Sequence, residues 1–251
     1  LSYSPRQVVK SVWEKAVMPV IFAELAASFR PSQVSDPNSP AAAANGQYLL
    51  ITRDAYDAVG GHAAIAANLV EDVALARAVK KSGRKICFRF GGDAVRTRMY
   101  RTFAQLREGW TKNLVLLFAS PMRLATLRAL EFILIVSSFA AGITTARHRH
   151  FQPALAAGIV CAILYAMFLT RIRRAHFSWD AALLALFGLP LFSYLLVRSN
   201  LSHKHGNVWW KGRRYPTSPG VTNPAATGIA DPAKSPDSKM QEQHGLSHAQ
   251  S

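Results

Sequence analysis

The second half of the sequence is dominated by three apolar stretches without a charged residue, at positions 132–146, 152–170 and 181–197. Each is near the short end of the roughly 17–25 residues that a helix needs to cross a hydrocarbon core, where a helix satisfies its own backbone polar groups. Arginine-rich segments separate the stretches, which favours membrane crossing over a bundle of buried core helices. The pattern predicts about three transmembrane helices within residues 113–200.

The first 112 residues instead alternate between short helical and strand patterns. A helical pattern lies within the first forty residues, and others begin near Arg53, at residues 69–81 and at residues 94–112. Strand patterns lie at residues 46–52 and 85–90. Residues 114–118 and 122–130 are expected to lie at the membrane interface. The pattern predicts an α/β domain joined to a membrane anchor.

Composition adds that the chain is strongly basic. It carries 30 Lys and Arg against 14 Asp and Glu, a net charge of +16, with a mean hydropathy of only +0.08. The basic residues are spread over loops and segment ends, so anionic lipid headgroups are the expected partner and nucleic acid is not. Cys87 and Cys161 lie in different kinds of segment, so no structural disulfide is expected and a reducing cytosolic face fits.

The C-terminal region, residues 201–251, divides into a basic aromatic patch and a polar tail. The patch at residues 208–215 combines tryptophans with Lys211 and arginines, a composition typical of the headgroup level of a membrane. From residue 216 onward the sequence is rich in Pro, Ser, Ala and Gln and has few large apolar residues. This tail is predicted to be disordered because it cannot form a core.

Candidate chemistry in the polar half centres on the adjacent carboxylates Glu71 and Asp72. They open the predicted helix 69–81, where unpaired backbone N–H groups and the helix dipole favour negative charge. Helix-start electrostatics explain the pair on spacing alone. Short motifs on both sides of the pair give it more weight as a site.

The order of these motifs resembles the family 2 glycosyltransferases, specifically the membrane-anchored members associated with hopanoid, carotenoid and ceramide glycosylation. The motifs are Asn45-Gly46-Gln47, Gly60-Gly61-His62, Glu71-Asp72, Arg98-Met99-Tyr100, Gly109-Trp110, the apolar stretches, and Trp210-Lys211-Gly212-Arg213. No single motif is specific, and the resemblance rests on their order over about residues 1–215. It implies the C-terminal half of a GT-A-like nucleotide-sugar transferase domain, residues 1–112, followed by about three transmembrane helices.

In that family the Asp of the Glu-Asp pair acts as general base, and Asp72 is the matching position. A hydroxyl is a poor nucleophile, so a carboxylate must take its proton in the transition state. Glu71 either orients Asp72 or only solvates the helix start. The resemblance implies inverting transfer of a hexose from a nucleotide-sugar donor to a lipid-like acceptor hydroxyl at the membrane.

A Gln/Arg-x-x-Arg-Trp element of the membrane-bound relatives corresponds to residues 106–110. Gly109 occupies its arginine position, which puts the phosphate contact of this element in doubt. Arg107 or Lys112 is the expected substitute cation for the diphosphate leaving group. Trp110 is either part of the acceptor site or an interfacial anchor.

Further substrate-binding candidates each have a simpler structural explanation. His62 follows Gly60 and Gly61 in a turn expected beside the reaction centre, although a loop histidine is more often only solvated or hydrogen-bonded. The two glycines either allow a ligand to approach the backbone or stop a helix. Asn45 and Gln47 either bind sugar hydroxyls or only solvate a strand edge.

The family holds a divalent cation, Mg or Mn, on the donor diphosphate through an Asp-x-Asp element, and no Asp-x-Asp occurs in this sequence. The chain begins at Leu1 with no signal peptide. We therefore expect a fragment that lacks the nucleotide- and metal-binding half and is inactive alone.

Two other functions stay open from the sequence. One is a non-catalytic, membrane-anchored module that binds lipid or polyanions through its basic surface. The other, a transporter fragment, is supported only by Glu131 at the edge of the first apolar stretch. The expected location is the cell inner membrane, with several crossings and a cytosolic catalytic part. Three crossings would place the tail outside, whereas its basic residues favour the inside.

Overall fold

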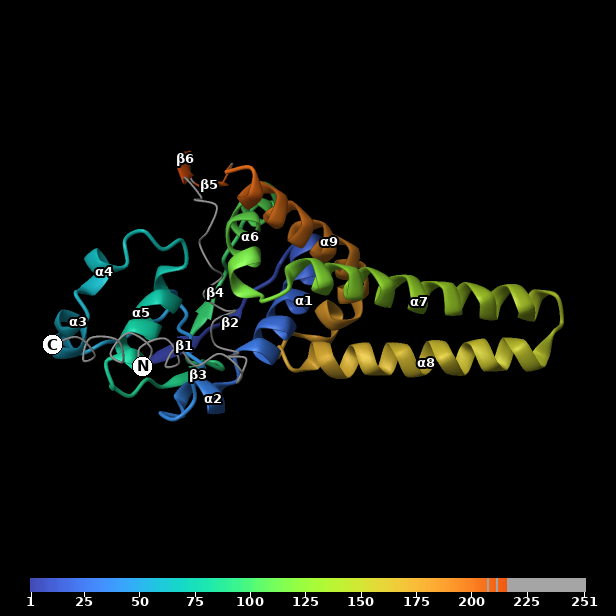
Figure 1. Ribbon diagram of the computed structural model, residues 1–251. Helices are drawn as coiled ribbons and strands as arrows, with labels where there is room; N and C mark the ends of the chain where they lie inside the picture. The colour runs from blue at the N-terminus through green and yellow to red at the C-terminus, as the bar shows by residue number, and fades with distance from the viewer. Residues whose placement is uncertain (207, 211, 216–251) are drawn as a thin grey trace, which may run out of the picture.

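The computed structural model describes residues 1–206, 208–210 and 212–215, which form a mixed body and a long helical hairpin (Figure 1). The helices are α1 Val12–Ser28, α2 Pro31–Ser35, α3 Arg53–Ala58, α4 Gly61–Ala64, α5 Glu71–Lys81, α6 Phe103–Leu117, α7 Pro121–Arg147, α8 Phe151–Arg173 and α9 Trp179–Lys204. The strands are β1 Ser2–Ser4, β2 Arg6–Gln7, β3 Phe88–Phe90, β4 Arg96–Thr97, β5 Val208–Trp210 and β6 Arg213–Tyr215. Lys211 and the tail predicted to be disordered lie outside the described residues.

The predicted α/β fold is confirmed in part, because the described residues are mostly helical and their sheets are small. Strand β1 pairs in parallel with β3, and β2 pairs in parallel with β4. Strands β5 and β6 form an antiparallel pair. These pairings bring the N-terminal strands beside the segment that follows α5, and so place the start of the chain near α5 (Figure 1).

Two predicted elements of the body are wrong in detail. Residues 46–52 do not form a strand, since Leu49 makes only an isolated bridge to Ser2. The helix predicted from residue 94 begins at Phe103, because Arg96–Thr97 pair with β2 and the Thr102 side chain caps the helix by accepting a hydrogen bond from the Gln105 N–H. The predicted helix 69–81 and strand 85–90 are confirmed as the slightly shorter α5 and β3.

Helix α1 is the centre of the main hydrophobic core. It begins where the Glu14 carboxylate accepts hydrogen bonds from the N–H groups of Lys10 and Ser11, at 2.9 and 2.7 Å. Its apolar side chains pack with those of α6 and α9 in one buried cluster. Helices α1 and α9 approach so closely that a side chain at Gly188 would collide with the Ala16 backbone.

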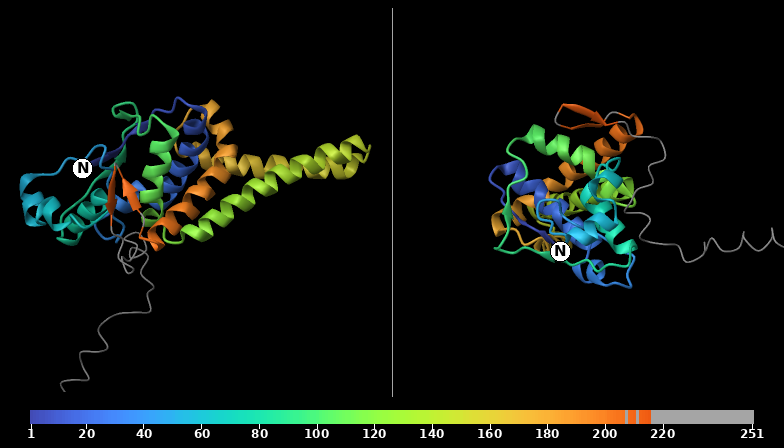
Figure 2. Two further views of the ribbon diagram at one scale, coloured as in Figure 1. Left: turned by 90° about the horizontal axis from the view of Figure 1, so that it is seen from above. Right: turned by 90° about the vertical axis from the view of Figure 1, so that its left-hand side faces the viewer.

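Helices α7 and α8 form an antiparallel hairpin that projects from the body (Figures 1 and 2). Each predicted apolar stretch falls within one long helix, and α7, α8 and α9 are all long and apolar enough to span a membrane. Residues 122–130, predicted to be interfacial, are the first turns of α7. The three helices differ in burial. In the 18-residue apolar segment of α9, 44% of the segment is buried in the protein, against 6% in the corresponding segments of α7 and α8.

A group of four charged side chains fastens the base of the hairpin to α1. Glu24 of α1 forms salt bridges with Arg128 and Arg171, at 2.9 and 3.4 Å. Glu131 of α7 forms salt bridges with the same two arginines, both at 2.8 Å. The structure therefore places Glu131, the support for a transporter, in a paired structural network of zero net charge.

Candidate functional site

Asp72 lies in the first turn of α5, with both carboxylate oxygens bound to backbone N–H groups. Its Oδ1 accepts a hydrogen bond from Val73 N–H at 2.8 Å. This N–H belongs to the first turn of the helix, where backbone N–H groups have no partner within the helix. Its Oδ2 accepts one from Gly46 N–H at 2.7 Å, from a different segment. These two bonds fix the carboxylate against a loop far away in sequence.

The loop that holds Asp72 is a tight turn at residues 45–48. The Tyr48 N–H donates to the Asn45 carbonyl at 3.0 Å, and the Gln47 N–H donates to Asn45 Oδ1 at 3.0 Å. The Ser2 hydroxyl of β1 accepts from Asn45 N–H at 2.8 Å and so anchors the turn. This network aims the Gly46 N–H at Asp72.

Burial makes the Asp72 carboxyl harder to ionise. Desolvation raises its pKa above the ordinary value of 3.8, and the charge of Glu71 raises it further. The hydrogen bonds from Gly46 and Val73 act in the opposite direction, but they do not outweigh burial. Among the described residues no salt bridge reaches Asp72.

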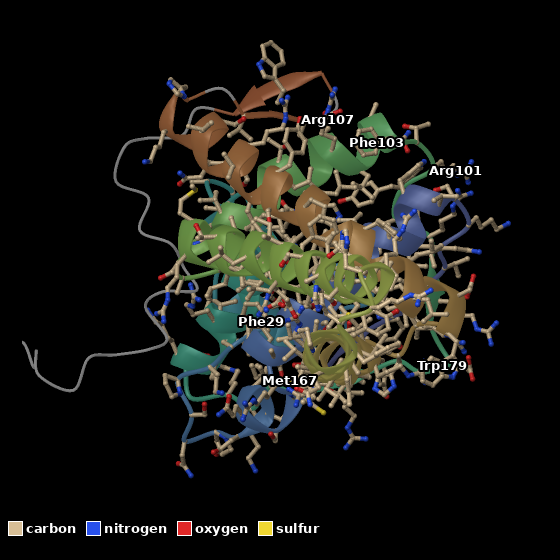
Figure 3. All side chains as sticks on the ribbon, turned by 90° about the vertical axis from the view of Figure 1, so that its right-hand side faces the viewer. Phe29, Arg101, Phe103, Arg107, Met167 and Trp179 are labelled. Atoms are coloured by element: carbon tan, nitrogen blue, oxygen red, sulfur yellow. The ribbon has the colours of Figure 1, made fainter. Side chains whose placement is uncertain are left out.

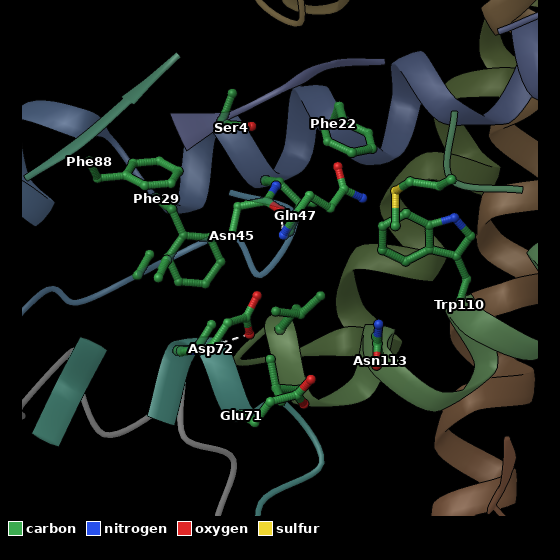
Figure 4. A pocket seen from close by; sticks show the side chains of 18 of the residues that line it. Ser4, Phe22, Phe29, Asn45, Gln47, Glu71, Asp72, Phe88, Trp110 and Asn113 are labelled. Carbon is green, nitrogen blue, oxygen red and sulfur yellow. Dashed lines mark hydrogen bonds between the residues drawn. The ribbon is translucent and has the colours of Figure 1, made fainter. Parts of the chain in front are cut away.

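Asp72 lines a pocket of about 180 Å³ between α1, α5, α6 and the 45–48 turn (Figure 4). The pocket brings together six of the residues predicted from the sequence. They are Asn45, Gln47, Glu71, Asp72, Trp110 and Lys112. Apolar side chains of α1 and of its C-cap form another part of the lining, including Phe22, Leu25 and the C-cap residue Phe29.

The four other predicted residues are not among those that line this pocket. Gly60, the N-cap of α4, and Gly61, its first residue, adopt left-handed conformations with φ of 74° and 56°. His62 is exposed, and its Nδ1 lies 2.8 Å from the Tyr56 hydroxyl, which also accepts a bond from the His62 N–H. Arg107 points outward from α6 and is exposed (Figure 3).

Trp110 is buried between two aromatic rings. The rings of Phe22 and Tyr100 each lie 6.1 Å from it, edge to face. Tyr100 also covers Gly109, where any side chain would collide with its ring. The space beside Gly109, where the sequence comparison expected an arginine, is therefore filled by Tyr100.

Two parts of the pocket were missed by sequence reasoning. Asn113 lines the pocket, and its buried Oδ1 has no hydrogen-bond partner among the described residues. It lies one helical turn beyond Gly109-Trp110, and this spacing was the available signal. The wall from α1 was missed because the helical pattern predicted within the first forty residues carries none of the motifs on which the site prediction depends.

Comparison with known families decides the identity of the chain, since residues 18–222 match glycosyl transferase family 21. The chain belongs to this family. The match covers all three long apolar helices and the pocket lining except Ser4, and it confirms the resemblance drawn from the short motifs. Family 21 membership suggests glycosyltransferase activity on a sugar donor and an acceptor. No curated protein and no solved structure matched the chain.

Family 21 has the GT-A type of domain, which is typically metal-dependent, so we asked whether the described residues fit a cation. No group of three or more His, Cys, Asp or Glu side chains lies together among them. Glu71 and Asp72 are the acidic residues of the pocket lining, and Asp72 already accepts two N–H bonds. The pocket does not fit a divalent cation, and no catalytic step is assigned to one. The prediction that the metal ligands lie outside this chain stays a prediction.

Proposed function

We propose that this family 21 chain carries the acceptor side of an inverting glycosyltransferase, with Asp72 as general base. The acceptor hydroxyl gives its proton to the Asp72 carboxylate as its oxygen attacks the anomeric carbon of the donor sugar. The new glycosidic bond forms as the bond to the nucleotide diphosphate breaks, and the diphosphate leaves with the bonding electrons. Attack opposite the leaving group inverts the anomeric centre.

The observation that carries this proposal is the environment of Asp72. A general base works best when its pKa lies near the working pH, and burial moves the Asp72 pKa in that direction. Among the described residues no arginine or lysine neutralises it by a salt bridge, so the carboxylate keeps its capacity to accept a proton. The bonds from Gly46 and Val73 hold it in one orientation. Glu71, its exposed neighbour, is assigned an electrostatic role only.

The lining supports an acceptor that has an apolar part and a hydroxyl. Phe22 of α1 and Phe29, which directly follows α1, lie opposite the Asp72 carboxylate (Figure 4). Leu25 of α1 adds to this apolar wall. This arrangement suits a lipid alcohol, whose chain packs on the α1 wall while its hydroxyl reaches the base. The long apolar helices keep the pocket close to a membrane, which supplies such a lipid.

The amide side chains of the pocket are proposed to bind sugar and acceptor hydroxyls. Asn45, Gln47 and Asn113 each carry an amide donor and an amide acceptor, so each can pair with a hydroxyl in either direction. The Gln47 Oε1 already accepts from Gln7 Nε2 at 3.1 Å, which leaves its NH₂ group for a ligand. His62 and Arg107 have no assigned role in this proposal, since they do not line the pocket.

Lys112 is the cation of the pocket lining and is proposed to face the diphosphate leaving group. Its ammonium lies 5.4 Å from the centre of the Trp210 ring, which holds the side chain in place from β5. The other donor contacts, including any Asp-x-Asp element and its Mg or Mn ion, are proposed to come from protein outside these residues. The active protein is accordingly a multi-pass membrane protein whose pocket faces the cytosol.

The test compares Asp72→Asn with Glu71→Gln in the protein expressed from its complete reading frame. Asn keeps the shape of the side chain but cannot accept the proton, so sugar transfer should fall by about 10²–10⁴-fold. Glu71→Gln removes a neighbouring charge of the same kind and should change the rate by no more than a few fold. Transfer is measured with UDP-glucose and a short-chain ceramide as probes, followed by NMR of the anomeric configuration of the product.

Membrane insertion should be equal in the two variants. Asn has a single acceptor oxygen, so Asp72→Asn loses the bond from Gly46 or the bond from Val73 and should unfold at a somewhat lower temperature. Transfer is therefore compared at a temperature at which both variants are folded, which separates a chemical loss from misfolding. Retained transfer by Asp72→Asn would remove the proposed base. A wild-type protein that inserts into membranes and binds lipid, but transfers no sugar from any of a panel of nucleotide sugars, would favour the non-catalytic module.

A further inference from the structure

Helix α9 has two distinct apolar faces. One face is buried against α1 and α6 and includes Ala185, Leu189 and Phe192. The opposite face is exposed and repeats at helical spacing along the length of the helix. We call it the α9 stripe, and it consists of Trp179, Leu183, Phe187, Pro190, Tyr194 and Leu201, with Arg198 near its C-terminal end.

The hairpin is exposed in a different way, because both of its helices present apolar side chains over most of their surface. Leu134 and Phe139 of α7 and Ile159 and Met167 of α8 are more than half exposed. Helix α8 has 23 residues and is therefore about 35 Å long, slightly more than the roughly 30 Å of a hydrocarbon core. The hairpin thus has the length and the surface of a pair of crossings.

Helix α9 is differently oriented from the hairpin. Seen along the hairpin, α9 runs across the face from which the hairpin rises, beginning at the edge where Trp179 is labelled (Figure 3). The view in Figure 1 agrees, since α9 lies obliquely at the base of the hairpin. If the hairpin enters a bilayer, α9 lies along the surface of that bilayer.

We propose that α7 and α8 are the membrane crossings of the described chain, and that α9 lies in the bilayer surface with the α9 stripe in contact with lipid. This proposal explains why α9 is apolar on two opposite faces, because protein covers one face and lipid covers the other. This inference does not depend on the role of Asp72.

A crossing by α9 would carry charged parts of the body into the hydrocarbon. Asp180, at its first turn, forms a 2.7 Å salt bridge with Lys15 of α1. Near its other end, Ser199 Oγ donates to the Thr111 carbonyl at 2.7 Å, which ties α9 to α6 beside the exposed Arg107. Because α9 packs against α1 and α6, a crossing would bring the charged residues of those helices toward the hydrocarbon. A charged residue costs roughly 2.5–3.5 kcal/mol at the membrane centre and less near its surface, so this packing opposes a crossing.

The composition of the α9 stripe fits the headgroup level of a bilayer. Trp and Tyr are enriched at that level, and the stripe carries Trp179 and Tyr194. The Arg173 guanidinium lies 4.2 Å from the centre of the Trp179 ring, so a positive charge sits at the point where α8 leaves the membrane. The α9 stripe therefore continues the lipid-facing surface of the hairpin rather than forming a separate patch for a protein partner.

This arrangement answers the question of sidedness that the sequence left open. With two crossings, the body and the β5–β6 pair lie on the same side of the membrane. Basic residues agree, because Arg123, Arg128, Arg171, Arg173 and Arg174 flank the hairpin on the body side, against Arg147 and Arg149 at its tip. The excess places the body on the cytosolic side.

The test of sidedness uses single cysteines in the complete protein, with Cys87 and Cys161 replaced by serine. Exposed positions are chosen in the body, at the hairpin tip and after α9, as Asp57→Cys, His148→Cys and His205→Cys. A membrane-impermeant maleimide is added to sealed inverted vesicles and to intact cells. Asp57→Cys and His205→Cys should react from the same side and His148→Cys from the other. Labelling of His205→Cys together with His148→Cys would overturn the proposal.

A second measurement tests the depth of α9 directly. Bimane is attached to Phe187→Cys on the α9 stripe or to Ile159→Cys on the hairpin, which are 64% and 51% exposed. The vesicles contain phosphatidylethanolamine and phosphatidylglycerol with quenchers placed near the headgroup or deep in the acyl chains. The probe at 187 should be quenched most by the shallow quencher, and the probe at 159 by the deep one. The proposal that the α9 stripe lies in the bilayer surface would be overturned by strongest quenching at 187 by the deep quencher. No quenching at 187, which would mean that protein covers the α9 stripe, would overturn it too.

Discussion

The base of the hairpin and the pocket around Asp72 hold the same kind of side chain in opposite surroundings. At the base, Glu24 and Glu131 each form salt bridges with Arg128 and Arg171. In the pocket, Glu71 and Asp72 are adjacent and form no salt bridge among the described residues, and burial raises the Asp72 pKa. Carboxylates that hold helices together are thus neutralised by arginine, whereas the proposed base is held by neutral N–H groups that leave it free to take a proton.

Removal of one arginine from the hairpin base should have the largest effect on stability. Arg171→Met leaves Glu131 and Glu24 sharing one guanidinium in a mostly buried site, so we expect a loss of about 3–5 kcal/mol in the free energy of unfolding. The exposed Arg147→Met, at the far end of the hairpin, is the matched control and should cost less than about 0.5 kcal/mol. Unfolding in detergent is the measurement, and equal midpoints for the two variants would show that the network does not hold the hairpin.

A fifth carboxylate, Glu14, sharpens the contrast with Asp72. Its burial opposes ionisation, but the Arg98 guanidinium 3.0 Å away and the N–H groups of Ser11 and Lys10 outweigh burial and lower its pKa from 4.5 to about 2. Glu14→Gln removes these charge-assisted bonds and should cost about 2–3 kcal/mol at pH 7.

The pH dependence of this cost follows from the direction of the shift. A depressed carboxyl pKa contributes stability that is complete above pH 4.5 and is lost as the pH falls from 4.5 toward 2. The difference between wild type and Glu14→Gln should therefore shrink over that interval. A difference between wild type and Glu14→Gln that stays constant with pH would contradict the assignment.

A smaller effect is expected where Tyr100 covers Gly109. Gly109→Ala places a methyl group against the Tyr100 ring and should cost roughly 1–2 kcal/mol. In a Tyr100→Ala background the same change should become neutral or stabilising, because alanine is the better helix former. A double-mutant cycle on unfolding free energies measures this coupling. Equal costs in both backgrounds would mean that Tyr100 does not exclude a side chain at this position.

The sequence predicted the regular and periodic parts of the molecule best. Helices α5 and α7–α9 follow from apolar spacing and from the absence of charge, both of which are local properties. The break before α6 was missed because it depends on pairing between β2 and β4, which are far apart in sequence. The burial of α9 could not be predicted either, since its close approach to α1 depends on Gly188 meeting Ala16.

The candidate site was predicted in part for the same reason. Asp72 was identified by its motif, but its partner, the Gly46 N–H, is set by a turn that Ser2 anchors from the start of the chain. The sequence predicted His62 near the site, whereas in the structure its Nδ1 is hydrogen-bonded to the hydroxyl of Tyr56, six residues earlier in the chain. Helical spacing could not have set Arg107 aside, because it precedes the buried Trp110, Thr111 and Leu114 by three, four and seven residues on α6. Its exposure depends on tertiary packing.

The most direct test of the contrast between the two regions is the pH dependence of kcat/KM for sugar transfer by the complete protein, with folding monitored at each pH. Asp72 can accept a proton only while it is ionised, and burial without a salt-bridge partner among the described residues raises its pKa. As the pH falls toward this raised pKa, kcat/KM should therefore begin to decline at a pH above the ordinary Asp value of 3.8. The same decline should occur in Glu71→Gln at a slightly lower pH, because this variant removes the negative charge of Glu71 that raises the Asp72 pKa. A rate that stays constant in folded protein down to pH 3.8 would contradict the account.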